Sequence, residues 1–154
     1  MRTKRSSAAN SGLRPLFIFL FVISSLVACS KQPIYPEPSL QGSEVVIDAG
    51  DLRSGGPVFF TFHYHGNQIN FFVLRVNEKV LSFLDACTSC YPSNRGYRID
   101  NGYLTCRKCD VRYSLSDIEK GFGTCSPISL EGRLQGGKYL IPVSVLEKAI
   151  NKPT

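Results

Sequence analysis

The chain has 154 residues, 19% of them charged, and a formal net charge of +6. Four of its basic residues precede Cys29 and no acidic residue does, so the rest of the chain carries only +2. That charge is too small for the basic footprint of a nucleic-acid-binding protein, and we expect no nucleic acid partner. The residues after Cys29 suffice for one small domain and not for two.

The start of the chain has the pattern of an export signal. A positively charged segment is followed by thirteen mostly apolar residues at positions 16–28. A membrane-spanning helix needs roughly 20 apolar residues, so this run is short for one and has the length of a signal-peptide core. An uncleaved signal anchor is the alternative.

The residues Leu26-Val27-Ala28-Cys29 resemble the lipobox of bacterial lipoproteins. The resemblance implies that 1–28 is a lipoprotein signal peptide, and that Cys29 carries a diacylglyceryl group and an acyl chain such as palmitate. Each buried CH₂ contributes about 0.8 kcal/mol, so several chains together hold a protein on a membrane. We therefore expect an extracytoplasmic protein, lipid-anchored to the cell membrane. Ser30 is compatible with the outer membrane of a didermic bacterium.

Residues 29–43 are expected to form the lipid anchor and a proline-rich, extended tether. Residues 44–154 should form the folded domain, which the pattern predicts to be mostly β. Turns are predicted at Gly66-Asn67, at Asn77-Glu78 and at Asp100-Asn101. The predicted strands are rich in aromatic and β-branched residues and cover 44–48, 58–64, 68–76, 79–84, 96–99, 102–105 and 138–142.

Alternation along the second predicted strand separates its side chains into two sets. Phe60, Phe62 and Tyr64 should share one face of the sheet, and Phe59, Thr61, His63 and His65 the other. Near the end of the chain, Ser144 and Glu147 have the spacing of a capping box and predict a short C-terminal helix. The expected fold is a small β-barrel or sandwich with that helix.

Four cysteines carry the strongest chemical signal of the sequence. Cys87 and Cys90 are separated by two residues, as are Cys106 and Cys109, and fifteen residues lie between the pairs. Two such CxxC loops, joined by a hairpin, can direct four sulfurs at one point, which suits zinc, an iron centre or an iron–sulfur cluster. We therefore predict that these four cysteines are metal ligands.

Two other interpretations of the cysteine pairs stay open. Outside the cytoplasm cysteines usually form disulfides, which would stabilise a small secreted domain. A CxxC disulfide closes a very short loop and is prone to reduction, so pairing between the loops would be the sounder arrangement. A redox-active dithiol is the third interpretation. With Cys125 the domain has five cysteines, so at least one thiol is left over in any pairing.

Five segments of the domain resemble the FtrD-like family of membrane iron–sulfur proteins, which is associated with bacterial iron transport. These segments are 85–91 (DACTSCY), 96–97 (GY), 104–109 (LTCRKC), 111–113 (VRY) and 123–128 (GTCSPI). The layout is also similar to a Rieske domain, with a Cys–Cys pair in each loop where a Rieske protein has Cys–His. The resemblance implies a Rieske-like β fold holding an iron–sulfur cluster or iron, with zinc as the alternative. It also implies that the loop containing Cys125 covers the metal.

The predicted export route limits which cofactors the site could hold. The leader contains no twin-arginine motif, so the chain is expected to cross the membrane unfolded. A cluster assembled in the cytoplasm could not travel with it, whereas zinc or a single iron could be bound afterwards. The sequence leaves the identity of the metal open.

Several residues near the predicted site have two interpretations each. Cys125 is either an additional ligand or redox thiol, or a small buried apolar residue. His63 and His65 could chelate a metal, but a solvated face near a hairpin tip is favoured. Arg107 and Lys108 either offset thiolate charge or face solvent. The nearby tyrosines, Tyr91, Tyr97, Tyr103 and Tyr113, are expected to pack around the loops.

The expected function is electron transfer or metal handling, linked by the family resemblance to a membrane iron-transport or redox protein as partner. The first alternative is a zinc-stabilised domain that docks a partner. The second is a thiol–disulfide oxidoreductase, which is disfavoured because the βαβ context of a thioredoxin-like motif is missing. No catalytic triad or carboxylate pair is present, so a redox or metal-binding accessory protein is expected rather than an enzyme.

Overall fold

The computed structural model describes residues 33–52, 56–121, 123 and 125–150. The predicted signal peptide and Cys29 lie outside these residues. The described part is mostly antiparallel β, with eleven strands, two short 3-10 helices and one α-helix. Among the described residues, no helix is long and apolar enough to cross a membrane. The prediction of a mostly β fold with a short C-terminal helix is confirmed.

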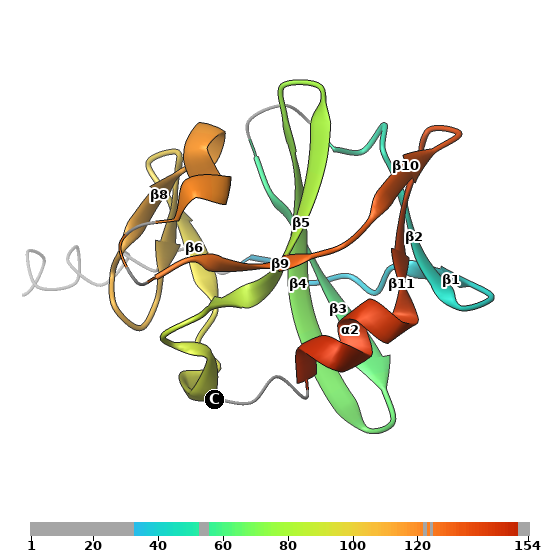
Figure 1. Cartoon of the computed structure of the whole chain (residues 1–154), viewed down its shortest axis with the longest axis horizontal. Helices are drawn as coiled ribbons and strands as arrows, with labels where there is room; N and C mark the ends of the chain where they lie inside the picture. The colour runs from blue at the N-terminus through green and yellow to red at the C-terminus, as the bar shows by residue number, and fades with distance from the viewer. Residues whose placement is uncertain (1–32, 53–55, 122, 124, 151–154) are drawn as a thin grey trace, which may run out of the picture. The chain divides into compact units, whose positions relative to one another are not determined.

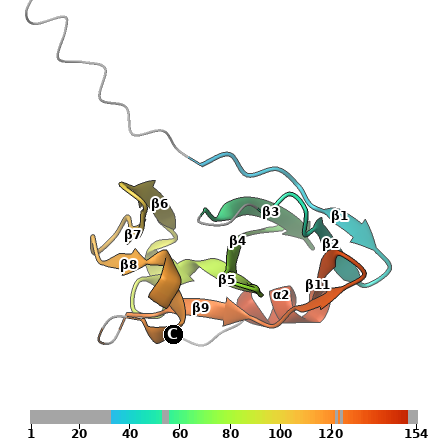
Figure 2. The ribbon, with the colours of Figure 1, turned by 90° about the horizontal axis from the view of Figure 1, so that it is seen from above.

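The strands form three antiparallel sheets, which lie side by side in the two views of Figures 1 and 2. The first sheet has the order β1-β2-β11-β10, with β1 at Ser39–Gln41, β2 at Glu44–Asp48, β10 at Arg133–Gln135 and β11 at Lys138–Pro142. The central sheet has the order β3-β4-β5-β9, with β3 at Val58–Tyr64, β4 at Asn67–Val76, β5 at Lys79–Cys87 and β9 at Pro127–Leu130. The third sheet has the order β6-β7-β8, with β6 at Tyr97–Asp100, β7 at Tyr103–Cys106 and β8 at Arg112–Ser114.

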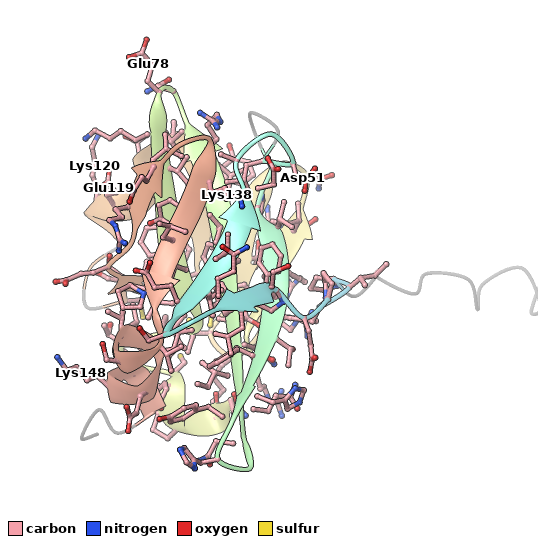
Figure 3. The ribbon with its side chains drawn as sticks, turned by 90° about the vertical axis from the view of Figure 1, so that its right-hand side faces the viewer. Asp51, Glu78, Glu119, Lys120, Lys138 and Lys148 are labelled. Carbon is pink, nitrogen blue, oxygen red and sulfur yellow. The ribbon has the colours of Figure 1, made fainter. Side chains whose placement is uncertain are left out.

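Three helical segments connect or close these sheets. The 3-10 helix η1 covers Tyr91–Ser93 and follows β5, and η2 covers Leu115–Lys120 and follows β8. The α-helix α2, at Val143–Ile150, continues directly from β11 and buries Leu146 and Ala149. Its exposed Lys148 points away from the domain in Figure 3, and Glu78 marks the tip of the β4–β5 hairpin.

Both faces of the central sheet are buried, and each face belongs to a separate hydrophobic core. The first core joins Phe60 and Phe62 to residues of the first sheet and of α2, among them Ile141 and Leu146. The second core joins Phe59 to the third sheet through Tyr97 and others. The alternation predicted for 58–64 is confirmed, because Phe60 and Phe62 lie in the first core and Phe59 lies in the second.

The second core places the cysteines. It contains Cys87 at the end of β5 and Cys106 at the end of β7, together with the aromatic rings of Phe72 and Tyr97. These two rings meet edge to face, with centroids 5.7 Å apart. Burying such rings contributes both the hydrophobic effect and a directional contact, which orients the third sheet on the central one.

Two predicted turns are displaced by one residue, the first toward the N-terminus and the second toward the C-terminus. The first hairpin turns at His65-Gly66, and β4 therefore begins at Asn67. The later hairpin turns at Asn101-Gly102. In both, the glycine takes the second central position, at φ +78° for Gly66 and +80° for Gly102, where a side chain would be strained. Glycine position, rather than the polar residue beside it, sets the register.

The start of α2 and the proline-rich segment also differ from expectation. Ser144 lies inside the first turn of α2 and is not its N-cap, because the helix begins at Val143, whose N–H donates to the carbonyl of Ser43 at 2.9 Å. The segment expected as a tether contacts the domain. The N–H of Thr61 donates to the carbonyl of Pro36 at 3.1 Å, and β1 pairs with β2.

Candidate metal centre

The first CxxC loop, Cys87–Cys90, follows directly on β5; we call it the first knuckle. Cys87 is 1% exposed because it ends a strand inside the second core. The N–H of Cys90 donates to the carbonyl of Cys87 at 3.1 Å, which closes a tight turn. Thr88 and Ser126 exchange hydrogen bonds, from the Thr88 N–H to the Ser126 carbonyl and from the Ser126 N–H to Thr88 Oγ1. The loop carrying Cys125 is thereby attached to the first knuckle.

The second CxxC loop, Cys106–Cys109, follows β7 and is the second knuckle. Its turn is closed by the N–H of Asp110, which donates to the carbonyl of Cys106 at 2.9 Å. The Cys106 N–H in turn donates to the carbonyl of Val111 at 2.9 Å. The N–H of Arg107 donates to the carbonyl of Gly96 at 3.0 Å, so the second knuckle is also attached to the start of β6.

The structure brings the four predicted ligands together. The Sγ atoms of Cys87, Cys90, Cys106 and Cys109 all lie within 4.8 Å of one another, and those of Cys87 and Cys106 are 3.9 Å apart. All four are free thiols. Burial decreases across the group, because Cys87 and Cys106 are buried, Cys90 is half-buried and Cys109 is exposed. The group therefore has a buried side and a side open to solvent.

Cys106 is the sulfur best prepared to be a thiolate. Burial raises its pKa, but the N–H groups of Cys109 and Lys108 and the thiols of Cys109 and Cys87 donate to its sulfur, and the net pKa is lowered. Burial, together with the hydrogen bonds that its thiol donates, raises the pKa of Cys87 above the ordinary range of a thiol. The same causes raise the pKa of Cys109 to about 12. The hydrogen bonds within the group therefore favour the thiolate form at Cys106 over that at Cys87 and Cys109.

Two buried tyrosines adjoin the sulfurs. Tyr97 is the cross-strand partner of Cys106, and its ring meets that of Tyr113 edge to face, with centroids 5.9 Å apart. Burial and the neighbouring cysteines raise the pKa of both phenols, so both stay protonated donors. Among the described residues, neither hydroxyl has a hydrogen-bond partner. The sequence predicted that these tyrosines pack around the knuckles. It did not predict that their buried hydroxyls lack hydrogen-bond partners among the described residues.

A buried carboxylate beside the site was missed by the sequence interpretation. Asp85 is 5% exposed; it accepts a hydrogen bond from the Tyr35 hydroxyl at 2.7 Å and one from the Tyr97 N–H at 2.7 Å. Burial raises its pKa, while these two hydrogen bonds and the charge of Arg107 act in the opposite direction. Asp85 therefore connects the proline-rich segment, β5 and β6 next to Cys87. An acidic residue among the apolar residues at the end of a strand was the available signal.

The remaining candidates lie outside the group of four. Cys125 is a half-buried free thiol that packs against the second core, and it is not one of the clustered sulfurs. His63 is exposed, and its Nδ1 forms a hydrogen bond with Oε1 of Glu37. His65 is an exposed turn residue whose ring meets that of Tyr64 edge to face. Within the described part of the chain, neither histidine belongs to a metal-binding group, which agrees with the favoured interpretation of a solvated hairpin.

The donor set fits a thiophilic metal. Four thiols without a carboxylate or histidine select zinc, iron or an iron–sulfur cluster over magnesium or calcium, which prefer oxygen. A bound metal would supply either a one-electron redox couple or a structural crosslink between the knuckles. The chain's own contribution is the hydrogen-bonded turns that place the sulfurs and the aromatic core that keeps water from Cys87 and Cys106.

Comparison with known proteins gives one result. The chain has no significant match among curated proteins or among solved structures. A family model described as membrane iron-sulfur containing protein FtrD-like matches residues 52–152, which include all four clustered cysteines and Cys125. That match spans well over half of the chain, so the protein belongs to the FtrD-like family of membrane iron–sulfur proteins.

Proposed function

We propose that the protein is an extracytoplasmic, lipid-anchored metal protein that transfers electrons beside a membrane iron-transport or redox system. The observation that carries this proposal is the cluster of four thiols within 4.8 Å, in a chain of an iron–sulfur family. A site made only of thiolates, with hydrogen-bond donors around the sulfurs, is the kind that holds redox-active iron in proteins.

The burial gradient supports electron transfer rather than catalysis on a bound substrate. Cys87 and Cys106 lie inside the second core, whose apolar side chains exclude water. Little solvent would therefore have to rearrange around the centre when an electron is transferred. Cys109 is exposed and lies next to the exposed Lys108. An electron would enter and leave through this edge, and the partner is expected to dock on the second knuckle.

Anchoring through Cys29 is part of the proposal. It is supported by the lipobox-like Leu26–Cys29 and by the short apolar run before it. The test is mass spectrometry of the membrane-extracted protein. We expect an N-terminal peptide beginning at Cys29 with diacylglyceryl and acyl groups, and none of it in a Cys29→Ala variant. A membrane-extracted protein that keeps residues 1–28 would contradict the lipid anchor.

The main test is metal analysis, a visible absorption spectrum and a redox titration of the full chain from the membranes of its host. We expect iron, sulfur-to-iron charge-transfer bands and a reversible one-electron transition. For a [2Fe–2S] cluster, ligation by thiolates alone should place the potential below that of a histidine-ligated Rieske cluster. Redox-inert protein with bound metal would contradict electron transfer. Metal-free protein with oxidised cysteine pairs would contradict the metal site itself.

The closed donor set favours one second candidate, a zinc-stabilised domain that docks a partner. Structural zinc sites are four-coordinate and tetrahedral, without an open position, as four clustered thiols would provide. Colourless protein with one zinc per chain would favour this candidate. The partner would then be sought by crosslinking from the second knuckle.

A further inference from the structure

The spacing of the four sulfurs bears on how many metal ions the site holds, an inference that rests on the proposed metal-binding function. All six Sγ–Sγ separations are at most 4.8 Å, and the buried pair, Cys87 and Cys106, is at 3.9 Å. The separations between donor atoms are set by the nuclearity of the centre, because each metal fixes the distance to its own ligands. The compactness of the group can therefore be compared with each centre that four thiolates could hold.

A single tetrahedral ion requires short separations. With metal–sulfur bonds of about 2.3 Å, tetrahedral geometry places every pair of sulfurs about 3.8 Å apart. The Cys87–Cys106 separation of 3.9 Å already matches this value. The other separations, at most 4.8 Å, would need to shorten by 1.0 Å or less.

A dinuclear cluster requires longer separations. In a [2Fe–2S] centre each iron takes two cysteines, and sulfurs on different irons lie about 5.5 Å apart or more, because the iron–iron vector is added between them. However the ligands are shared out, four of the six separations are of this kind. All of them would have to exceed the largest separation observed, 4.8 Å. In a [4Fe–4S] centre each cysteine binds a different iron, so all six separations would be about 6 Å.

Several hydrogen bonds oppose the larger sulfur–sulfur separations that a cluster would require. The sulfur of Cys106 accepts from the N–H groups of Lys108 and Cys109, and the sulfur of Cys109 accepts from the N–H of Val111. In the first knuckle the N–H of Cys90 donates to the sulfur of Cys87. Moving the sulfurs of one knuckle apart by rotating their side chains would remove these donors. Moving the knuckles apart would strain the contacts that hold each of them in place, Thr88 with Ser126 and Arg107 with Gly96.

We propose that Cys87, Cys90, Cys106 and Cys109 bind one metal ion in a tetrahedral site, without inorganic sulfide. In the electron-transfer role this ion would be iron, which would supply a one-electron ferric/ferrous couple and take its electron from a reduced partner. Such a centre still belongs to an iron–sulfur protein, because its iron is bound only by sulfur. Cys125 has no part in the ligand set.

The test is the composition of the full chain, extracted in detergent from the membranes of its host without added iron or sulfide. Iron, zinc and acid-labile sulfide are measured per chain, and X-ray absorption at the metal edge gives the neighbours of the metal. We expect one metal per chain, no sulfide, a single shell of about four sulfurs and no metal–metal scattering. Two irons and two sulfides per chain would overturn this inference and leave the metal-binding function intact.

The other outcomes separate this inference from the proposed function. One iron without sulfide supports both. One zinc without sulfide supports the single-ion site and overturns electron transfer. Protein without metal, in which the four cysteines are disulfide-bonded, overturns both.

A cobalt titration gives a second measurement that does not depend on the host. Metal-free, reduced full-length protein is titrated with Co²⁺, and the absorption of tetrahedral, thiolate-bound cobalt is followed. We expect an endpoint at one cobalt per chain in the native protein and in a Cys125→Ser variant, the matched control. A Cys106→Ser variant should lose the thiolate-to-cobalt absorption or bind at least 100-fold more weakly. An endpoint at two cobalts per chain, or an endpoint changed by Cys125→Ser, would overturn the assignment.

Discussion

Replacing Gly96 with alanine tests the packing of the carboxylate that lies beside the metal centre. Gly96 has φ +67°, and a Cβ built on it would lie 2.3 Å from Oδ2 and 2.8 Å from Cγ of Asp85. Asp85 cannot turn away without cost, since its two oxygens accept the hydrogen bonds of Tyr35 and Tyr97 and it is 5% exposed. Gly96→Ala should therefore strain the backbone and displace Asp85.

The magnitude follows from two contributions. Alanine in a left-handed conformation costs about 1–2 kcal/mol. Loss or distortion of hydrogen bonds to a buried charged group costs about 1.5–3 kcal/mol for each bond. Together these lower the free energy of unfolding by about 3–5 kcal/mol.

Gly102 provides the matched control. It has φ +80° in the turn before β7, but no atom lies within 4 Å of a Cβ built on it. Gly102→Ala should therefore cost only the backbone contribution, about 1–2 kcal/mol. The difference between the two variants, about 2–3 kcal/mol, corresponds to roughly 10 °C in Tm for a domain of this size.

The assay is chemical and thermal unfolding of both variants, followed by circular dichroism. Equal losses in Gly96→Ala and Gly102→Ala would refute the close packing of Asp85 on Gly96. A double-mutant cycle gives a further check, because in an Asp85→Ala background Gly96→Ala should cost no more than Gly102→Ala does.

Three further predictions concern the cores and the sulfurs. Phe72→Ala should lower the free energy of unfolding by about 3–5 kcal/mol, since Phe72 is fully buried. As a control in the same denaturation assay, Ile34→Ala should change it by less than about 0.5 kcal/mol, because Ile34 is 80% exposed. Tyr113→Phe should leave the stability of the metal-free protein unchanged or raise it slightly, because the hydroxyl removed is buried without a partner among the described residues; a loss above about 1.5 kcal/mol in urea would reveal a hidden partner. Metal affinity should fall steeply with acid, because Cys87 and Cys109, whose pKa values are raised, must each release a proton. Between about pH 6 and 8, competition with a chelator should show the logarithm of the zinc affinity rising by at least about 2 per pH unit, and a slope near zero would contradict protonated thiols in the free site.

Local patterns in the sequence predict the strands and the clustering of the cysteines. Alternation in 58–64 separates Phe59 from Phe60 because a pleated strand allows only two directions for its side chains. The four cysteines converge because each CxxC spacing closes a turn and the hairpin β6–β7 returns the chain by a short path. Both features depend on residues that are close in the sequence, so local patterns are sufficient to predict them.

Contacts between distant segments could not be read from the sequence. The hydrogen bond from Tyr35 to Asp85 spans 50 positions, and no periodicity indicates it. The strands β1, β8, β9 and β10 were missed for a similar reason, and each has only three or four residues. β9 is only four residues long, and its pairing with β5 shifts register between Phe83 and Cys87, so its partner is determined by the tertiary fold. Two of the three predicted hairpin turns were displaced by one residue, because in each the glycine with positive φ takes the second central position of the turn.

The proposed single-ion site and the proposed export route support each other physically. A chain that crosses a membrane unfolded reaches the far side with four separate cysteines, and a sulfide-bridged cluster would then need a source of iron and sulfide there. One ion requires only that four sulfurs lie close together, and the backbone hydrogen bonds of each turn and the packing of the second core hold them within 4.8 Å of one another. The N–H groups of Lys108 and Cys109 donate to the sulfur of Cys106 and lower the pKa of its thiol, which favours the thiolate form that a metal ion binds. An ion supplied after export is therefore sufficient to complete the single-ion site, whereas a cluster would also need sulfide.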